Sequence, residues 1–171
     1  MIEIRREKPE DVPAIRCVNE TAFGQPQEAN VVDRLREACD ELLSLVAVDG
    51  GRVIGHILFS PAVLGGQNPA VHGVGLAPMA VLPEFQRKGV GSMLVRRGLE
   101  ILRELACPFV IVLGHAEYYP RFGFERASRY GITSQWKGVP DEAFMILVLD
   151  ASAMKGVSGV APYRNEFDEA M

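Results

Sequence analysis

The chain has 171 residues, of which 48% are hydrophobic and 23% are charged, so its length and composition are those of one globular domain. A net charge of −4 at pH 7 offers no overall positive field for nucleic acid or an anionic membrane. No stretch approaches the roughly 18 apolar residues that span a bilayer. The three cysteines (Cys17, Cys39 and Cys107) match neither a zinc nor a disulfide pattern. We therefore expect a cytoplasmic protein with reduced thiols and without a metal, nucleic-acid or membrane partner.

The first part of the chain predicts a strand, two helices and a hairpin. Ile2–Arg6 alternates in polarity, which is typical of a short strand. Pro9 and the acidic residues after it open a first helix, and a second helix is expected from about Gln27 to Ala38. Between two apolar runs, Asp49-Gly50-Gly51 predicts a tight hairpin turn, because Asp-Gly readily adopts positive φ.

The next segment is expected to be a loop followed by an interrupted strand. Residues Pro61 to His72 are rich in glycine and include Asn68, a composition that predicts a loop. The apolar run from Gly73 to Leu82 predicts a strand that contains Pro78. Because proline has no N–H to donate to a ladder, we expect a bulge or an unpaired stretch near this residue.

The second half predicts a long helix between two parallel strands. Apolar residues recur at helical spacing from Val90 to about Leu105, and Phe109–Leu113 is a continuous apolar run of the kind buried on both faces of a sheet. A crossover of this length returns the chain in the same direction. A final strand is expected over Ala143–Leu149. We expect residues 1–150 to form the domain and residues 151–171 to be a tail that packs on it or extends from it.

The segment Gln86–Ser92, between strand and helix, is the strongest candidate for a binding site. Gly89 and Gly91 allow the backbone to approach a ligand closely, and the following helix adds the positive end of its dipole. Arg87 and Lys88 add two cations, so a pyrophosphate could be held locally although the chain is acidic. The Walker A pattern and the third glycine of the dinucleotide fingerprint are absent. Taken alone, Gly-x-Gly also fits an ordinary turn.

Two motifs at this point resemble the GNAT superfamily of acyl-CoA-dependent N-acetyltransferases. Gln86–Gly91 fits its signature [QR]-x-x-G-x-[GA], and Tyr119–Phe124 is similar to the Tyr-x-x-x-Gly-Phe segment after the family's fifth strand. Tyr118-Tyr119 and Gly55-His56 are similar to a bacterial subgroup with generally unassigned substrates. The resemblance implies a single-domain α/β (α+β) fold with a mixed, mostly antiparallel sheet, a central splayed parallel pair and helices on both faces.

The resemblance also implies acetyl-CoA as co-substrate and assigns residues to it by motif position. The pantetheine arm would enter between the splayed strands, and the pyrophosphate would lie on the loop. The cofactor-binding residues are then Met79, Ala80, Val81, Gln86, Arg87, Lys88, Gly89, Val90, Gly91 and Ser92. Tyr119 is the expected catalytic residue, as proton donor to the departing thiolate. The alternative is that Tyr119 only packs against the strand.

The sequence leaves the general base open. An alkylamine has a pKa near 10.4, so a base must take its proton before attack. His56, His72, His115, Glu28 and Glu117 are candidates, and a chain of water molecules is another. His56 could equally be a packed strand residue.

Our leading hypothesis is transfer of an acetyl group from acetyl-CoA to a primary amine, on a small molecule or a peptide, by direct attack in a ternary complex. The alternative is a non-catalytic acyl-CoA-binding module that regulates a partner. Trp136 either lines an acceptor pocket or anchors the packing of its loop. A homodimer through an exposed final strand is a further hypothesis.

Overall fold

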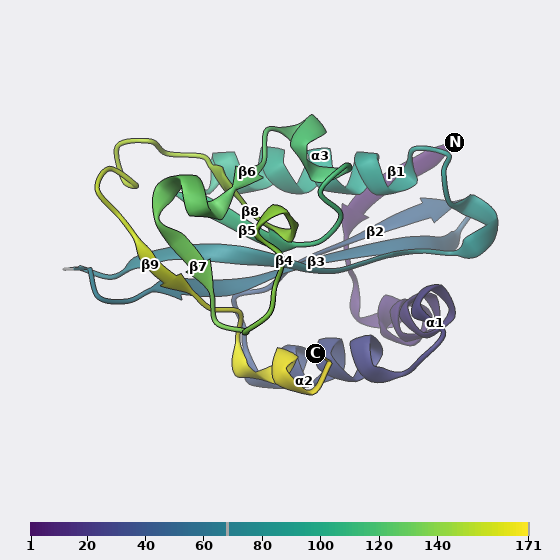
Figure 1. Cartoon of the computed structure of the whole chain (residues 1–171). Helices are drawn as coiled ribbons and strands as arrows, with labels where there is room; N and C mark the ends of the chain where they lie inside the picture. The colour runs from purple at the N-terminus through teal and green to yellow at the C-terminus, as the bar shows by residue number, and fades with distance from the viewer. Residues whose placement is uncertain (68, 171) are drawn as a thin grey trace. The chain divides into compact units, whose positions relative to one another are not determined.

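The computed structural model describes residues 1–67 and 69–170. Within these residues the chain forms three α-helices and nine strands (Figure 1). The helices are α1 (Val12–Phe23), α2 (Gln27–Ala38) and α3 (Val90–Glu104). The strands are β1 (Ile2–Arg6), β2 (Leu43–Asp49), β3 (Arg52–Leu64), β4 (Val71–Val81), β5 (Phe109–Leu113), β6 (Glu125–Arg126), β7 (Ile132–Ser134), β8 (Phe144–Val148) and β9 (Gly159–Ala161).

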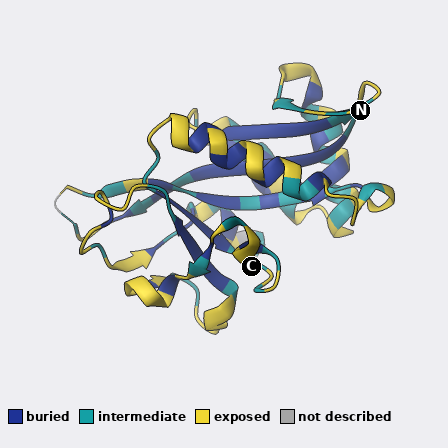
Figure 2. Cartoon of the chain, turned by 90° about the horizontal axis from the view of Figure 1, so that it is seen from above, coloured by how far each residue is buried: buried dark blue, intermediate teal, exposed yellow. Residues whose placement is uncertain are grey.

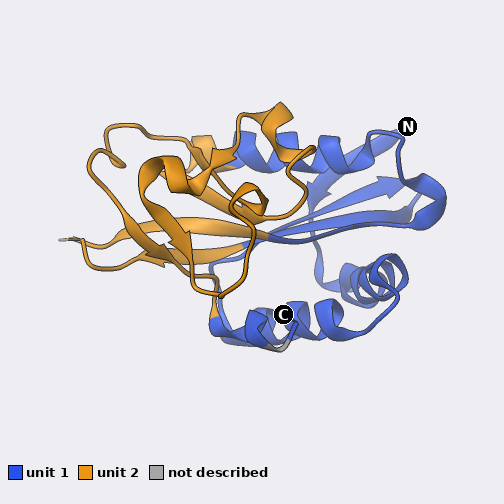
Figure 3. Ribbon diagram, viewed as in Figure 1, with its two compact units in different colours: residues 1–59, 77–101, 165–171 blue, residues 60–76, 102–164 orange. Residues whose placement is uncertain are grey.

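The backbone divides into two compact units (Figure 3). Unit 1 comprises residues 1–59, 77–101 and 165–171, and unit 2 comprises residues 60–76 and 102–164. Seven strands are hydrogen-bonded in the order β1-β2-β3-β4-β5-β8-β6, and β7 pairs with β9 separately. No described helix is long and apolar enough to cross a membrane.

The strand pairing confirms the mixed, mostly antiparallel sheet expected from the sequence. β1 with β2, β2 with β3, β5 with β8 and β6 with β8 are all antiparallel. β4 and β5, the strands on either side of α3, are parallel, with Val74–Leu76 opposite Val110–Val112. The long helix is therefore the expected crossover between parallel neighbours.

Helices cover both faces of the strands in unit 1, as expected (Figure 1). Neighbouring residues on a strand point to opposite faces. A Cβ added at Gly55 of β3 would lie 3.3 Å from Val90 and 3.2 Å from Leu94, so α3 packs closely on this face. The next residue, His56, contacts Asn19 of α1 on the other face. In Figure 2 α3 shows alternating buried and exposed stripes, as its helical spacing predicts.

The loop expected from Pro61 to His72 is shorter than predicted, because only residues 65–67 and 69–70 of the described chain lie outside the two strands here, and the prediction was wrong at both ends. β3 continues to Leu64 and β4 already begins at Val71. The physical reason is burial, since Ala62 and Leu64 are 2% and 0% exposed and give this segment the alternation of a strand. Asn68 lies outside the described residues.

β4 runs as one strand from Val71 to Val81 and includes Pro78, where we expected a bulge or an unpaired stretch. The peptide bond between Ala77 and Pro78 is cis. The β4 residues paired with β5, Val74–Leu76, all precede this proline.

β8 is neither the last strand nor an edge strand, and both points correct the sequence analysis. β9 follows it in the chain. β5 pairs with one side of β8, and Glu125 and Arg126 of β6 pair with Ile146 and Met145 on its other side. The exposed final strand that we considered as a dimer surface is therefore absent at β8, and a homodimer stays an untested hypothesis.

The tail after β8 contributes buried side chains to both units. In unit 2, β9 pairs with β7 in parallel, and Tyr163 is 5% exposed. In unit 1, Phe167 is 6% exposed, and the Arg34 guanidinium donates a hydrogen bond of 3.1 Å to the Glu166 carbonyl. The described part of residues 151–171 is thus tied to the fold by sheet pairing and side-chain burial.

Candidate active site

The loop between β4 and α3 exposes its backbone. Pro83–Phe85 form one turn of 3-10 helix, and Arg87 and Gly89 then adopt φ values of 62° and 87°. A Cβ added at Gly89 would meet no atom within 4 Å. Glycine at position 89 therefore has two effects. It adopts the left-handed conformation without strain, and it leaves open space in front of the main chain.

The start of α3 has the features of a candidate anion site at this loop. The Gly89 carbonyl accepts the Met93 N–H at 3.0 Å, so the amides of Val90 and Gly91 precede the first helical hydrogen bond and have no acceptor within the helix. α3 is 15 residues long and presents the positive end of its dipole here. The exposed side chains of Arg87 and Lys88 add positive charge. This combination suits a phosphate or pyrophosphate group.

Gln86 ties the loop to the end of β4. Its side-chain amide donates a hydrogen bond of 2.8 Å to the Val81 carbonyl, and the Leu82 N–H donates to the Ile54 carbonyl at 2.9 Å. Along the preceding strand Ala80 is buried, whereas Met79 and Val81 are partly exposed. The structure therefore brings the expected cofactor residues together in unit 1 and shows Gln86 bonded to the main chain of this group.

Tyr119, the expected proton donor, lies in unit 2 and is 6% exposed. Its ring makes edge contacts with Tyr118 and Phe124, at centroid distances of 5.1 and 5.6 Å. A Cβ added at Gly114 would lie 2.6 Å from the Tyr119 ring, so only glycine permits this packing. Burial, with a smaller contribution from Tyr118, raises the pKa of Tyr119 well above its ordinary value. The phenol is therefore protonated at neutral pH.

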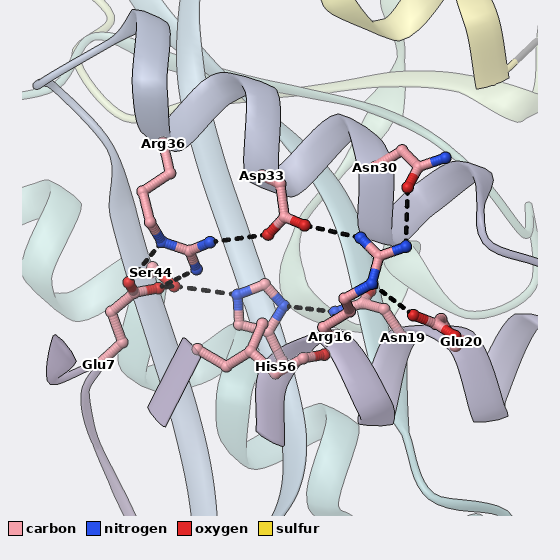
Figure 4. Close-up of polar contacts among 10 residues, drawn as sticks. Glu7, Arg16, Asn19, Glu20, Asn30, Asp33, Arg36, Ser44 and His56 are labelled. Atoms are coloured by element: carbon pink, nitrogen blue, oxygen red, sulfur yellow. Dashed lines mark hydrogen bonds and ion pairs between the residues drawn. The ribbon is translucent and has the colours of Figure 1, made fainter. Parts of the chain in front are cut away.

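His56 lies at the centre of a buried polar network (Figure 4). Its Nδ1 is 3.1 Å from the Asn19 side-chain amide and its Nε2 is 2.9 Å from the Ser44 hydroxyl. Ser44 donates its own proton to the Glu7 carboxylate, so His56 Nε2 is the donor to Ser44 and Nδ1 accepts from Asn19. Burial lowers the pKa of His56 to about 4. His56 was considered both as a general base and as a packed strand residue. The second role fits this geometry, because the ring is 0% exposed and both ring nitrogens are hydrogen-bonded.

The other candidate bases lie nearer the surface. His72 is an exposed residue of β4, and His115 is exposed, with its carbonyl accepting the amides of Tyr118 and Tyr119 at 3.1 and 3.4 Å. The Glu28 carboxylate accepts two hydrogen bonds of 2.9 Å from the Gln25 side chain. Among the residues that the structure describes, no group of three or more His, Cys, Asp or Glu side chains is arranged to hold a metal ion.

Trp136 lines a cavity of about 220 Å³ in unit 2, together with apolar side chains that include Ile132 and Phe144 and with the acidic Asp141. The indole also stacks on Tyr163, with ring centroids 5.6 Å apart and planes inclined by 24°. Trp136 therefore anchors packing, as one of the two alternatives expected, and it also borders a cavity, whose use as an acceptor pocket stays a hypothesis. Tyr163 was missed by the sequence analysis, because its only signal is an aromatic residue within a polar tail.

Comparison with known proteins agrees with this geometry. The acetyltransferase (GNAT) domain family matches residues 3–127, which include both the loop Gln86–Ser92 and Tyr119. The chain is 37% identical over 166 residues to YhbS, an uncharacterized N-acetyltransferase of Escherichia coli, covering 96% of this chain and 98% of that protein. It is 48% identical over 119 residues to YjhQ, an uncharacterized N-acetyltransferase of Escherichia coli, covering 67% of this chain and 65% of that protein.

Solved structures give the same result. Escherichia coli YhbS in complex with CoA superposes with a TM-score of 0.90 at 36% identity, covering 98% of this chain and 92% of that one. A GNAT acetyltransferase of Brucella melitensis in complex with acetyl-CoA has a TM-score of 0.79 at 35% identity, with coverage of 98% and 99%. The fold, the family match and these relatives thus define an acyltransferase of the acyl-CoA-dependent class. The chain belongs to the GNAT acetyltransferase family.

Proposed function

We propose that the protein transfers the acetyl group of acetyl-CoA to a primary amine, on a small molecule or a peptide in the cytoplasm, by direct attack in a ternary complex. The observation that carries this proposal is the open main chain at Gly89, which directly precedes α3 and follows the exposed cations Arg87 and Lys88. The CoA complex of YhbS and the acetyl-CoA complex of the Brucella relative support the choice of co-substrate.

In this proposal two adjoining segments of unit 1 hold acetyl-CoA. The amides and cations of Gln86–Ser92 bind the pyrophosphate, and the main chain of Met79–Val81 binds the pantetheine arm as a neighbouring strand would. Gln86 keeps the two segments in register through its hydrogen bond to Val81. Binding is therefore chiefly by backbone groups, which explains how an acidic protein can hold a polyanion.

The proposed chemistry needs a neutral amine and a stabilised leaving group. The amine nitrogen attacks the thioester carbonyl, a C–N bond forms, and a backbone N–H of β4 stabilises the oxyanion. The intermediate then collapses, the C–S bond breaks, and CoA leaves as a thiolate. Tyr119 is the proposed donor to this sulfur. Because its pKa is raised, the phenol is protonated before the reaction, and its strongest contribution is a hydrogen bond to the thiolate.

The amine proton leaves through a group other than His56, which is enclosed and already bonded at both ring nitrogens. His72 and His115 are the exposed histidines, and the carboxylates of Glu28 and Glu117 or a chain of water molecules are the alternatives. For the acceptor itself, we include the cavity beside Trp136 in the proposed binding region.

Replacement of Tyr119 by phenylalanine tests this mechanism. Tyr119→Phe keeps the buried ring and removes the donor, so we expect kcat to fall by about 100-fold while the Kd for acetyl-CoA stays the same. Release of free CoA thiol is measured across a panel of primary amines, and acetyl-CoA binding is measured by calorimetry. Tyr118→Phe, on the neighbouring ring, is the matched control.

Unchanged turnover in Tyr119→Phe would remove this residue from the mechanism and leave it as a packing residue. Binding of acetyl-CoA by the unmodified protein without thiol release for any amine would instead favour the regulatory module.

A further inference from the structure

Tyr163 reaches from the tail to the end of the parallel ladder in unit 2. Its ring stacks on Trp136 and packs closely against β4, since a Cβ added at Gly75 would be 2.6 Å from a ring carbon. The side chain is 5% exposed. No other residue could replace Gly75 without moving this ring, so the tail packs against the strand without space for an additional side-chain atom.

The Tyr163 hydroxyl bridges the two parallel strands. It donates to the Leu76 carbonyl at 2.9 Å and accepts the Leu113 N–H at 3.3 Å, and the Ile111 carbonyl is 3.4 Å away. In a parallel ladder a carbonyl faces the amide of the residue that follows its partner. Since Leu76 is opposite Val112, the phenol engages the two groups, on Leu76 and Leu113, that face each other at the last pair of the ladder.

This position is where β4 changes its role along the chain. Val74–Leu76 pair with β5, and Met79–Val81 form the segment to which we assign the pantetheine arm. Between them Pro78 has no N–H with which to extend pairing. The phenol gives a carbonyl and an amide of the last ladder pair an additional hydrogen-bond partner, directly before the point at which pairing with β5 ends. Burial raises the pKa of Tyr163, so the hydroxyl keeps the proton that this bridge requires.

We propose that Tyr163 is a positioning residue that fixes the point at which β4 and β5 stop pairing, and that it thereby keeps the following segment of β4 available to the pantetheine arm of acetyl-CoA. This inference rests on the proposed function. It predicts that Tyr163 matters for the arm of the ligand and not for its nucleotide half, which binds at the loop before α3.

Calorimetric titration with two ligands tests the inference. Acetyl-CoA contains the arm, whereas 3′-phospho-ADP, the nucleotide half of CoA, does not. In Tyr163→Phe the ring and its packing remain and only the bridge is lost, so we expect the Kd for acetyl-CoA to rise about tenfold and the Kd for 3′-phospho-ADP to change less than about twofold. In steady-state assays the KM for acetyl-CoA should rise while kcat stays near the wild-type value.

A pair of glycine variants provides an independent test. Gly75→Ala displaces the Tyr163 ring without altering the tyrosine, and Gly73→Ala creates an equal clash, at 2.6 Å, with the ring of Phe109. Both variants strain β4 in unit 2, but only the first moves the bridge. We expect Gly75→Ala to weaken acetyl-CoA selectively, as Tyr163→Phe does, and Gly73→Ala to leave the ratio of the two dissociation constants unchanged.

The outcomes separate this inference from the proposed function. If the wild-type protein binds no acetyl-CoA, the proposed function fails. If it binds acetyl-CoA but Tyr163→Phe weakens both ligands equally or neither, or if the two glycine variants behave alike, Tyr163 has only a structural role and the inference is wrong.

Discussion

Two polar regions of unit 1 differ in what their groups can still bind. At the loop before α3, the main chain at Gly89 is open and the Arg87 and Lys88 side chains are exposed. At His56 both ring nitrogens already have partners within the fold. Histidine is the more versatile chemical group, yet the loop is the more accessible candidate site. The type of a residue therefore indicates what chemistry its side chain can do, and the solvent accessibility of that side chain decides whether a ligand can reach it.

The network around His56 joins α1 and α2 to the strands (Figure 4). Arg36 of α2 binds the Glu7 carboxylate through two hydrogen bonds of 3.0 and 3.1 Å. Asp33 of α2 accepts from Arg36 at 3.2 Å and from Arg16 of α1 at 2.6 Å. Partly exposed ion pairs of this kind contribute little each. Here they provide partners for the Glu7 carboxylate, which is linked through Ser44 to the buried His56.

The largest effect is expected at Gly89. Gly89→Val strains a left-handed residue and fills the open space before the main chain, so the affinity for acetyl-CoA should fall by about 100-fold. Calorimetry measures this change. Gly50→Val is the matched control, because Gly50 also has positive φ, 56°, and an added Cβ there would meet no atom within 4 Å, but it lies in the β2–β3 turn. Equal losses in the two variants would show that strain, and not ligand contact, is responsible.

The next effect is acid sensitivity from His56. Its pKa is about 4 in the folded protein and near 6.5 when exposed, so below pH 6.5 the unfolded state binds more protons. The free energy of unfolding should therefore fall as pH decreases from 6.5 toward 4, by about 2 kcal/mol between pH 7 and pH 5 from this group. Urea denaturation at several pH values measures the slope.

Two variants isolate the contribution of His56. His56→Gln should be less stable at pH 7 but should lose most of the decline between pH 7 and pH 5. His72→Gln, on the exposed histidine of β4, should keep the wild-type decline. For Glu7, burial raises the pKa, but hydrogen bonds from Arg36 and Ser44 outweigh it and lower the pKa below its usual 4.5. That carboxylate loses its stabilising effect only at more acidic pH, so it does not mask the test.

The smallest effect is expected from the loop cations. Removing both in Arg87→Ala/Lys88→Ala should weaken acetyl-CoA about tenfold and make its affinity less sensitive to salt, because exposed charges are screened. Arg97→Ala/Arg103→Ala removes the same charge from exposed positions of α3 and should leave affinity nearly unchanged. If both double variants behave alike, the loop contributes only through overall charge.

Sequence reasoning predicted the elements whose signals are local. The bounds of α2, Gln27–Ala38, and of β5, Phe109–Leu113, agree with the structure, because helical spacing and a continuous apolar run are properties of the segment itself. The end of β3 and the existence of β9 were missed. Both depend on partners: Leu64 is buried by the rest of the fold, and β9 pairs with the distant β7.

The candidate site also divides into features with local sequence signals and features that depend on distant parts of the chain. The loop Gln86–Ser92 was recognisable from glycine spacing and from the helix that follows, since both act within a few residues. The burial of His56 could not be read from its neighbours in the chain, because Asn19, Ser44 and Glu7 come from three other parts of the chain.

The amino-acid order by itself thus determined the helices, the central strands, the candidate binding loop before α3 and the resemblance to acetyltransferases. Only the tertiary structure decided that His56 is enclosed and neutral, and that Tyr163 bridges Leu76 and Leu113 at the end of the parallel ladder. The physical reason is the distance along the chain over which each property is determined. Backbone conformation and amphipathic spacing are set within a few residues, whereas burial and hydrogen-bond partners are set by segments that meet only when the chain has folded.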